Sequence, residues 1–139
     1  MNVVVDTNVL VSGLLRPFSP PGEIVRMISA GELRLCIDGR LIAEYGEVLR
    51  RPKFQFEPAL VGDFLDLIVH EGFLVAGTPL DAKLPDDDDR PFLEVAVASG
   101  ARGLVTGNLK HFPAHARQGI KVLSPTQFLE FYRPYRNKP

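Results

Sequence analysis

The sequence predicts an α/β fold, a three-layer α/β/α sandwich in which helices cover both faces of a mainly parallel central sheet. Two observations support this prediction. Strand and helix signals alternate along the whole chain, as they do where parallel strands are joined by crossover helices. The first strand, Val3-Val4-Val5, is a continuous β-branched run, and such runs are typical of strands buried on both faces of a sheet.

The segment after the first strand is expected to pass through a loop into a helix. Val9 to Leu15 is short and apolar, and it stops at Arg16-Pro17. The residues Ser19-Pro20-Pro21-Gly22 have the composition of a loop. We expect a helix from about Glu23 to Ala30, ended by Gly31, because glycine readily adopts the backbone conformation that closes helices.

A second strand and a longer helix follow. Leu33 to Ile37 is the strand, and Asp38 is a suitable N-cap for a helix from about Gly39 to Arg51. Pro52 ends this helix because proline cannot continue the hydrogen-bond ladder. One face of the helix carries an apolar stripe, made of Leu41, Tyr45, Val48 and Leu49.

The middle of the chain predicts a helix, a strand and a loop. Pro58 opens the helix, which stops at Gly72 and has apolar residues at helical spacing, namely Leu60, Phe64, Leu67 and Ile68. Phe73 to Ala76 reads as the third strand. The stretch from Gly77 to Asp88 is polar and ends in an acidic run, so we expect an exposed loop there.

The last third of the chain continues the alternation. A helix is expected over roughly Asp89 to Ser99, with Gly100 as its stop. Gly103 to Thr106 and Ile120 to Leu123 are the fourth and fifth strands. Ser124-Pro125-Thr126-Gln127 has the pattern of a capping box with proline at the first helical position, and it predicts a final helix.

The length and composition indicate one globular domain. A chain of 139 residues with 45% hydrophobic and 24% charged residues is large enough for one substantial core. We expect a single domain over residues 1–133. A flexible tail is expected over 134–139, because this segment follows a helix and is rich in proline.

The charge and the apolar runs exclude little about partners but favour a cytoplasmic protein. A net charge of −1 does not indicate a nucleic-acid binder, although local basic patches matter more than the sum. The one cysteine, Cys36, lies in a predicted strand and rules out a disulfide within the chain. No apolar run reaches the ~18 residues of a membrane span, and no signal peptide precedes the first strand.

Three acidic residues lie where strands end or on helices that follow them. Asp6 follows the first strand, Asp89 begins a helix, and Glu44 lies at the margin of an apolar helical stripe. Each also has a structural reading: a turn residue for Asp6, an N-cap for Asp89, and a boundary residue reaching water for Glu44. Taken one at a time, these structural readings are preferred.

The conjunction of the three changes the interpretation. Ligands of open α/β sheets bind outside the carboxyl ends of the strands, where these side chains are expected to meet. Crowded carboxylates raise one another's pKa, and a divalent cation removes that conflict. Oxygen ligands suit Mg²⁺ or Mn²⁺. The sequence has no zinc-like cluster of His and Cys and no glycine-rich phosphate loop. Metal-assisted phosphodiester hydrolysis is the most natural remaining reaction.

The chain from Val3 to about Phe131 resembles a PIN domain, in particular the branch described as toxins of toxin–antitoxin pairs. The resemblance rests on four segments in the family's order: Val3–Leu10 with Asp6, Leu41–Leu49 with Glu44, Asp89–Ala96 with Asp89, and Leu104–Asn108 with Asn108.

The resemblance implies a PIN-like fold and a ribonuclease that uses Mg²⁺ or Mn²⁺. Asp6, Glu44 and Asp89 would be its catalytic residues and metal ligands. It also implies an RNA substrate, an antitoxin protein that occupies the active-site groove, and a homodimer. The supporting polar groups would be Thr7, Asn8, Ser12 and Asn108.

One position departs from the family's pattern. Many members carry an aspartate where this chain has Asn108. An amide oxygen can still ligate a metal or position a water, but one negative charge is lost. A weaker or absent second metal is the expected consequence, unless Asp86, Asp87 or Asp88 supplies the missing charge.

Basic side chains are available to bind the RNA backbone. The candidates are Arg16, Arg50, Arg51, Lys53, Arg90 and Lys110. For any one of them a solvated surface position is the alternative. His111 is read as a core or loop residue, close enough after Asn108 to support the site.

Three other interpretations stay open at this level. The first is an inactive PIN-like module that binds RNA or a protein partner, favoured by Asn108. The second is a phosphatase of the haloacid dehalogenase type, but that class needs a second aspartate at the position of Asn8. The third is a receiver domain, whose phosphorylated aspartate should follow a later strand, and Asp38 fits that poorly.

Overall fold

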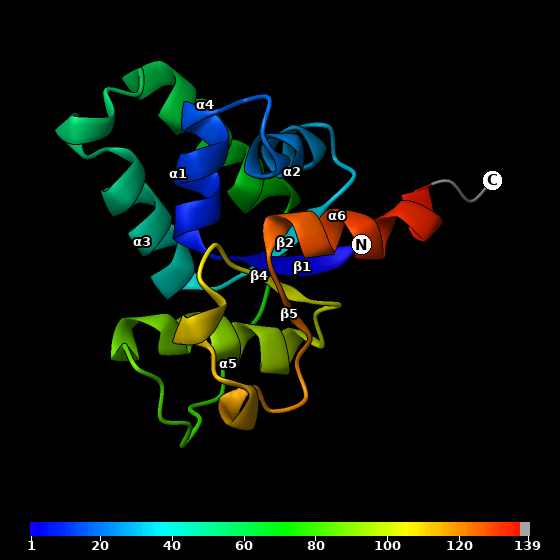
Figure 1. The fold of residues 1–139 in the computed structure, drawn as a ribbon. Coiled ribbons are helices and arrows are strands. Elements are labelled where there is room, and N and C mark those ends of the chain that lie inside the picture. Colours follow the sequence, from blue (N-terminus) through cyan, green and yellow to red (C-terminus); the bar gives the residue numbers. More distant parts are fainter. Residues whose placement is uncertain (137–139) are drawn as a thin grey trace.

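The structure, a computed structural model, describes residues 1–136 and contains one parallel sheet at its centre (Figure 1). Its five strands are all parallel and lie in the order β3-β2-β1-β4-β5. Their bounds are β1 (Asn2–Val5), β2 (Arg34–Ile37), β3 (Phe73–Leu74), β4 (Leu104–Val105) and β5 (Val122–Leu123). The predicted mainly parallel sheet is therefore confirmed.

Helices lie on both sides of this sheet, which confirms the three-layer arrangement. In Figure 1, α1, α2, α4 and α6 lie above the sheet and α5 lies below it. The helices are α1 (Thr7–Leu15), α2 (Pro20–Ser29), α3 (Gly39–Leu49), α4 (Pro58–Glu71), α5 (Arg90–Ser99) and α6 (Pro125–Arg136). Short 3-10 turns are η1 (Pro52–Phe54), η2 (Asp87–Asp89), η3 (Leu109–His111) and η4 (Ala114–Ala116).

The strand order places the end of β1 at the point where the sheet changes its direction of winding. β1 is the middle strand, and Val3, Val4 and Val5 are fully buried. The chain builds β2 and β3 on one side of β1 and then returns to build β4 and β5 on the other. Crevices open outside the carboxyl ends of strands at such a switch point. Asp6 stands there, directly after Val5.

Helix α2 begins earlier than the sequence analysis predicts. Residues 19–22 were expected to form a loop, but Ser19 is the N-cap of α2, and its hydroxyl accepts a hydrogen bond from the Gly22 N–H at 3.2 Å. Pro20 and Pro21 occupy the first helical turn. Proline is tolerated there because the N–H it lacks has no partner within the helix.

The segment between β3 and α5 is less exposed than expected. Ala82 and Leu84 are buried in the core, and the Leu80 N–H donates to the buried carboxylate of Glu94 at 2.7 Å. Glu94 also pairs with Arg40 at 2.6 Å. Most of this loop is exposed, as predicted, but two buried apolar side chains and the hydrogen bond to Glu94 hold part of it against α5.

The last helix has the predicted cap and runs past the predicted domain boundary. The Gln127 N–H donates to Ser124 Oγ at 3.1 Å, and the Ser124 N–H donates to Gln127 Oε1 at 2.9 Å. α6 then continues to Arg136, whose guanidinium pairs with Glu23 and Glu32 of the α2 region. Residues 134–136 of the expected tail are thus helical, and 137–139 lie outside the described residues.

Two smaller predictions concern the cysteine and the membrane. Cys36 is buried in β2, as expected of a structural thiol. Over residues 1–136 no helix combines the length and the apolar character needed to cross a bilayer.

Candidate active site

Asp6 lies at the carboxyl end of β1 and is only 4% exposed. Its Oδ2 accepts a hydrogen bond from the hydroxyl of Thr106 at 2.9 Å and one from the Asn8 amide at 3.4 Å. Burial raises the pKa of Asp6, while the hydrogen bonds from Thr106 and the Thr7 backbone and the charge of His111 act to lower it. Asp6 is therefore a buried carboxylate with its orientation fixed from both sides.

Glu44 is brought to the same region by the packing of the residue that follows it. Tyr45 is fully buried, and its hydroxyl donates to the backbone carbonyl of Val5 at 2.6 Å. This bond fixes α3 against the end of β1. Glu44 is consequently half-buried, and the Thr7 hydroxyl donates to its carboxylate. Burial raises the pKa of Glu44, the Thr7 bond lowers it, and the charge of Asp6 raises it further.

Asp89 is positioned by the start of α5. Phe92, one turn further, is buried with its ring centroid 6.2 Å from that of Tyr45, so α5 packs against α3. The side chain of Asp89 is 13% exposed, and its Oδ2 lies 3.1 Å from Nδ1 of His111. That contact does not have hydrogen-bond geometry. Asp89 Oδ2 is thus buried without a hydrogen-bond partner among the residues described.

The pKa of Asp89 shows that the three carboxylates share one electrostatic environment. It is raised to about 6, first by burial and then by the charge of Asp6, with smaller contributions from Asp86 and Glu44, while His111 lowers it. Asp6 likewise raises the pKa of Glu44. The sequence analysis expected these side chains to meet at one sheet edge; in the fold the charge of Asp6 acts on both Glu44 and Asp89. Asp89 makes no capping hydrogen bond to α5, so its structural reading as an N-cap fails.

The carboxylate oxygens of the site are suitable ligands for a hard cation, but they do not lie at ligand distances from a common point. Oxygen ligands with raised pKa values and a buried oxygen without a partner, Asp89 Oδ2, are what a Mg²⁺ or Mn²⁺ ion would satisfy. Within residues 1–136, however, no three His, Cys, Asp or Glu side chains already converge at ligand distances. The donor chemistry fits a divalent metal, which Asp6, Glu44 and Asp89 would hold.

The predicted supporting residues differ in what they contact. Thr7 bonds Glu44, and Asn8 links Asp6 to the next loop by accepting the Gly107 N–H at 3.0 Å. Asn108 uses its side-chain oxygen to accept the Lys110 N–H at 3.2 Å, which caps η3. Ser12 is exposed one turn beyond Asn8 and has no hydrogen bond to the carboxylates.

Two residues that orient the aspartates were not selected as site residues from the sequence. Thr106 is fully buried, donates to Asp6, and accepts the Asn108 N–H at 3.1 Å. His111 faces Asp89 from η3. A hydroxyl that ends the strand next to β1 was the available signal for Thr106. For His111 the only signal was its nearness to Asn108 in the chain.

The predicted RNA-binding cations are scattered, and several are already paired. Arg51 pairs with Glu47, Arg90 pairs with Asp87, and Lys53 lies over the ring of Phe54. Within residues 1–136 the charged groups of the remaining candidates form no ion pair or hydrogen bond; these are Arg16, Arg50 and Lys110. Arg50 is the C-cap of α3 and lies six residues after Glu44, about 9 Å along the helix axis.

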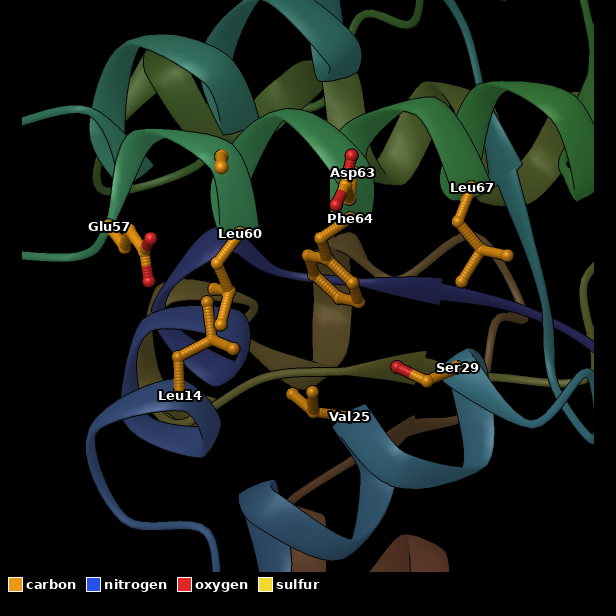
Figure 2. A pocket seen from close by; sticks show the side chains of 9 residues that line it. Leu14, Val25, Ser29, Glu57, Leu60, Asp63, Phe64 and Leu67 are labelled. Atoms are coloured by element: carbon orange, nitrogen blue, oxygen red, sulfur yellow. The ribbon is translucent and has the colours of Figure 1, made fainter.

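Two hollows of the surface have none of the three carboxylates in their lining. One, of about 570 Å³, runs between α1, α2 and α4 and is mainly apolar, with Leu14, Leu60 and Phe64 in its walls (Figure 2). The other, of about 540 Å³, includes Ser12 and Gly107 in its lining. Because the size of a hollow says nothing about its chemistry, we place the candidate active site at the carboxylates.

The comparison with protein families matches residues 2–110 to the PIN domain, well over half of the chain. The chain belongs to the PIN-domain family. No curated protein and no solved structure gives a significant match. PIN domains are generally nucleases and typically use divalent metals. Membership therefore favours a nuclease-type function and replaces the dehalogenase-type and receiver interpretations.

Proposed function

We propose that this PIN domain is a metal-dependent endoribonuclease that hydrolyses RNA phosphodiester bonds as the toxin of a toxin–antitoxin module. The observation that supports it most is the shared environment of Asp6, Glu44 and Asp89, three carboxylates from distant parts of the chain, where burial raises each pKa and the charge of Asp6 raises the pKa of the other two. Such an arrangement is unfavourable unless a cation or a proton neutralises it.

Each carboxylate has a distinct part in this proposal. Asp6 and Asp89 hold Mg²⁺ or Mn²⁺ directly, and Glu44 ligates it or orients a water. Thr106 and Asn8 keep Asp6 in position, and Thr7 does so for Glu44. The chemistry that the metal supplies is an acidified water and a neutralised phosphate charge. Since Asn108 caps η3 and carries no charge, we propose that one metal suffices.

The partners and location belong to the proposal as well. We propose a protein antitoxin, a homodimer and a cytoplasmic location, as the resemblance to the toxin branch of the family implies. The exposed apolar groove between α1, α2 and α4, with Glu57 and Asp63 in its lining, supports a protein partner with an apolar, basic segment (Figure 2).

A catalytically inactive module that binds RNA or protein is the second candidate. It is favoured by Asn108 in place of an aspartate and by the open spacing of the carboxylates. In that case the acidic cluster would bind a cation weakly and cleave nothing.

An RNA cleavage assay with Mn²⁺ tests the proposal. Wild type is compared with Asp6→Asn and Asp89→Asn, and both variants should lose roughly 100-fold or more in rate, as expected when a directly acting group is removed. Asp66→Asn, an exposed aspartate of α4, is the matched control and should cleave like wild type. Undiminished cleavage by both site variants would refute the assignment. No cleavage by wild type, with Mn²⁺ shown to bind by calorimetry, would favour the inactive module.

A further inference from the structure

A second hollow, distinct from the apolar groove of Figure 2, adjoins the carboxylate site. It has a volume of about 540 Å³, which falls in the usual range of ~300–1,000 Å³ for small-molecule sites. The end of α1, the start of α2, the loop after β4 and the start of α6 form its walls. Its lining residues are Ser12, Leu15, Arg16, Ser19, Pro20, Pro21, Gly107, Pro125 and Thr126. We refer to it as the α1–α6 groove.

The α1–α6 groove lies next to the candidate active site. Gly107, one of its lining residues, donates its N–H to Asn8 Oδ1 at 3.0 Å, and the amide of the same Asn8 reaches Asp6 Oδ2 at 3.4 Å. Ser12 follows Asn8 by one helical turn on the same side of α1. The lining residue Arg16 follows the other end of α1, about 13 Å along the helix axis from Asp6. An RNA strand with a phosphate at Asp6 would therefore reach the far end of the groove further along its length.

The lining suits a nucleotide better than a purely apolar ligand. Arg16 is exposed and its guanidinium forms no ion pair or hydrogen bond within residues 1–136, so it can contact a phosphate. The hydroxyls of Ser12 and Thr126 can bond a base or a ribose. Leu15 and the proline rings at the start of α2 and α6 offer apolar surfaces.

An exposed aromatic ring belongs to the turn that carries two lining residues of this groove, and hydrogen bonds hold that turn in place. Phe18 is 99% exposed and lies in the chain between the lining residues Arg16 and Ser19. The loop is fixed because Ser19 Oγ donates to the Arg16 carbonyl at 2.6 Å and Arg26 donates to the carbonyl of Pro17. Gly22 packs so closely that a Cβ there would lie 2.3 Å from the Pro17 carbonyl oxygen. An unpaired aromatic face presented on a rigid loop is a platform for stacking.

We propose that the α1–α6 groove is a subsite for single-stranded RNA, in which Phe18 stacks on a base further along the strand from the scissile phosphate and Arg16 contacts a phosphate beside that base. The inference rests on the proposed nuclease function, since the carboxylates define where the scissile phosphate lies. Single strands are favoured because only an unstacked base can present its face to Phe18. A protein segment would use the apolar contacts but would leave Arg16 without an anionic partner.

A tryptophan reporter tests this directly, because the chain has no tryptophan. The Phe18→Trp variant is titrated with a six-nucleotide single-stranded RNA, in EDTA and in Mg²⁺, and its fluorescence should be quenched saturably as a base stacks on the indole. The matched control is Val69→Trp on α4, a position 55% exposed and away from the groove. Its fluorescence should not change. Equal quenching in both variants, or none in Phe18→Trp under either condition, overturns the subsite.

Affinity measurements give a second, independent readout. In fluorescence polarisation with labelled RNA, Phe18→Ala should weaken binding roughly tenfold, while Phe18→Tyr should restore it, as expected of stacking. Arg16→Ala should lower the slope of log affinity against log salt by about 0.7, one phosphate contact to a single strand. Val69→Ala is the control. Unchanged affinity in Phe18→Ala contradicts the proposal.

The outcomes separate this inference from the proposed function. Cleavage of RNA without quenching of Phe18→Trp means that the enzyme assignment holds and the subsite fails. Quenching without any metal-dependent cleavage means that the groove binds single-stranded RNA while the nuclease assignment fails.

Discussion

Asp6 and Asp89 are both withdrawn from water, yet their carboxylates contact very different surroundings. Asp6 receives hydrogen bonds from Thr106 and Asn8, two side chains fixed by the sheet and by α1. Asp89 has an imidazole beside it but no hydrogen-bond partner for its buried Oδ2. The burial raises both pKa values, and that of Asp89 reaches about 6. Hydrogen bonds therefore orient Asp6 before any cation binds, whereas a bound cation would give the buried Oδ2 of Asp89 the partner that it lacks.

The physical reason lies in the elements that carry them. Asp6 follows the central strand, and Thr106, directly after the neighbouring strand β4, places its hydroxyl beside it. Asp89 ends a short 3-10 turn that precedes α5, and its position depends on the packing of that helix, including the contact of Phe92 with Tyr45. The predictions below test this difference, from the largest expected effect to the smallest.

Replacing Phe92 should loosen the Asp89 half most strongly. Phe92→Ala is expected to lower the free energy of unfolding by ~3–5 kcal/mol, because a buried aromatic ring is removed and a cavity remains. Urea denaturation followed by circular dichroism measures it. Phe92→Leu, which keeps most of the apolar volume, should cost much less. An equal loss in both variants would mean that ring packing does not hold the two halves together.

The pH dependence of stability should report on Asp89. Its pKa is raised to about 6 in the folded protein from 3.8, so the folded state binds more protons than the unfolded state between these values. The free energy of unfolding should therefore fall as pH rises from about 4 to about 6.5, by on the order of 2 kcal/mol. Asp89→Asn should flatten this profile, and so should added Mn²⁺. Asp66→Asn, the exposed control, should keep the wild-type slope.

Removing the Thr106 hydroxyl should make Asp6 resemble Asp89. Thr106→Val keeps the shape of the side chain but removes the 2.9 Å hydrogen bond to Asp6. Mn²⁺ affinity, measured by calorimetry, should fall about 10- to 100-fold, as is typical when a group that orients a metal ligand is lost. Thr78→Val, in an exposed loop, is the control. Unchanged affinity in Thr106→Val would mean that Asp6 needs no orienting partner.

Restoring the charge at position 108 should have the smallest effect. Asp can cap η3 as Asn108 does, so Asn108→Asp should fold normally. One more negative charge near the site should increase Mn²⁺ affinity about fivefold, which corresponds to ~1 kcal/mol. Calorimetry with a fitted stoichiometry also shows whether a second ion binds. A decrease in affinity would contradict the placement of Asn108 beside the metal site.

Much of this protein could be predicted from local sequence patterns. The buried run Val3–Val5, the caps Asp38 and Ser124, and the alternation of apolar periods predicted the parallel sheet and the helices around it. These features are local, because a cap or a periodic stripe depends on residues within a few positions. Ser19 was misread because the same serine and prolines occur in loops and in first helical turns, and only the packing of α2 distinguishes them.

What only the tertiary structure decided is the difference between the two aspartates. The sequence placed Asp6, Glu44 and Asp89 at strand and helix ends and predicted that they meet, since parallel strands end at one edge. Its local patterns did not show which side chains would contact each carboxylate. Thr106 lies 100 positions from Asp6, and His111 reaches Asp89 from a separate turn. Burial and hydrogen bonding depend on neighbours in space. The pKa shift of each carboxyl group and its ability to bind a cation are therefore set only when the chain is folded.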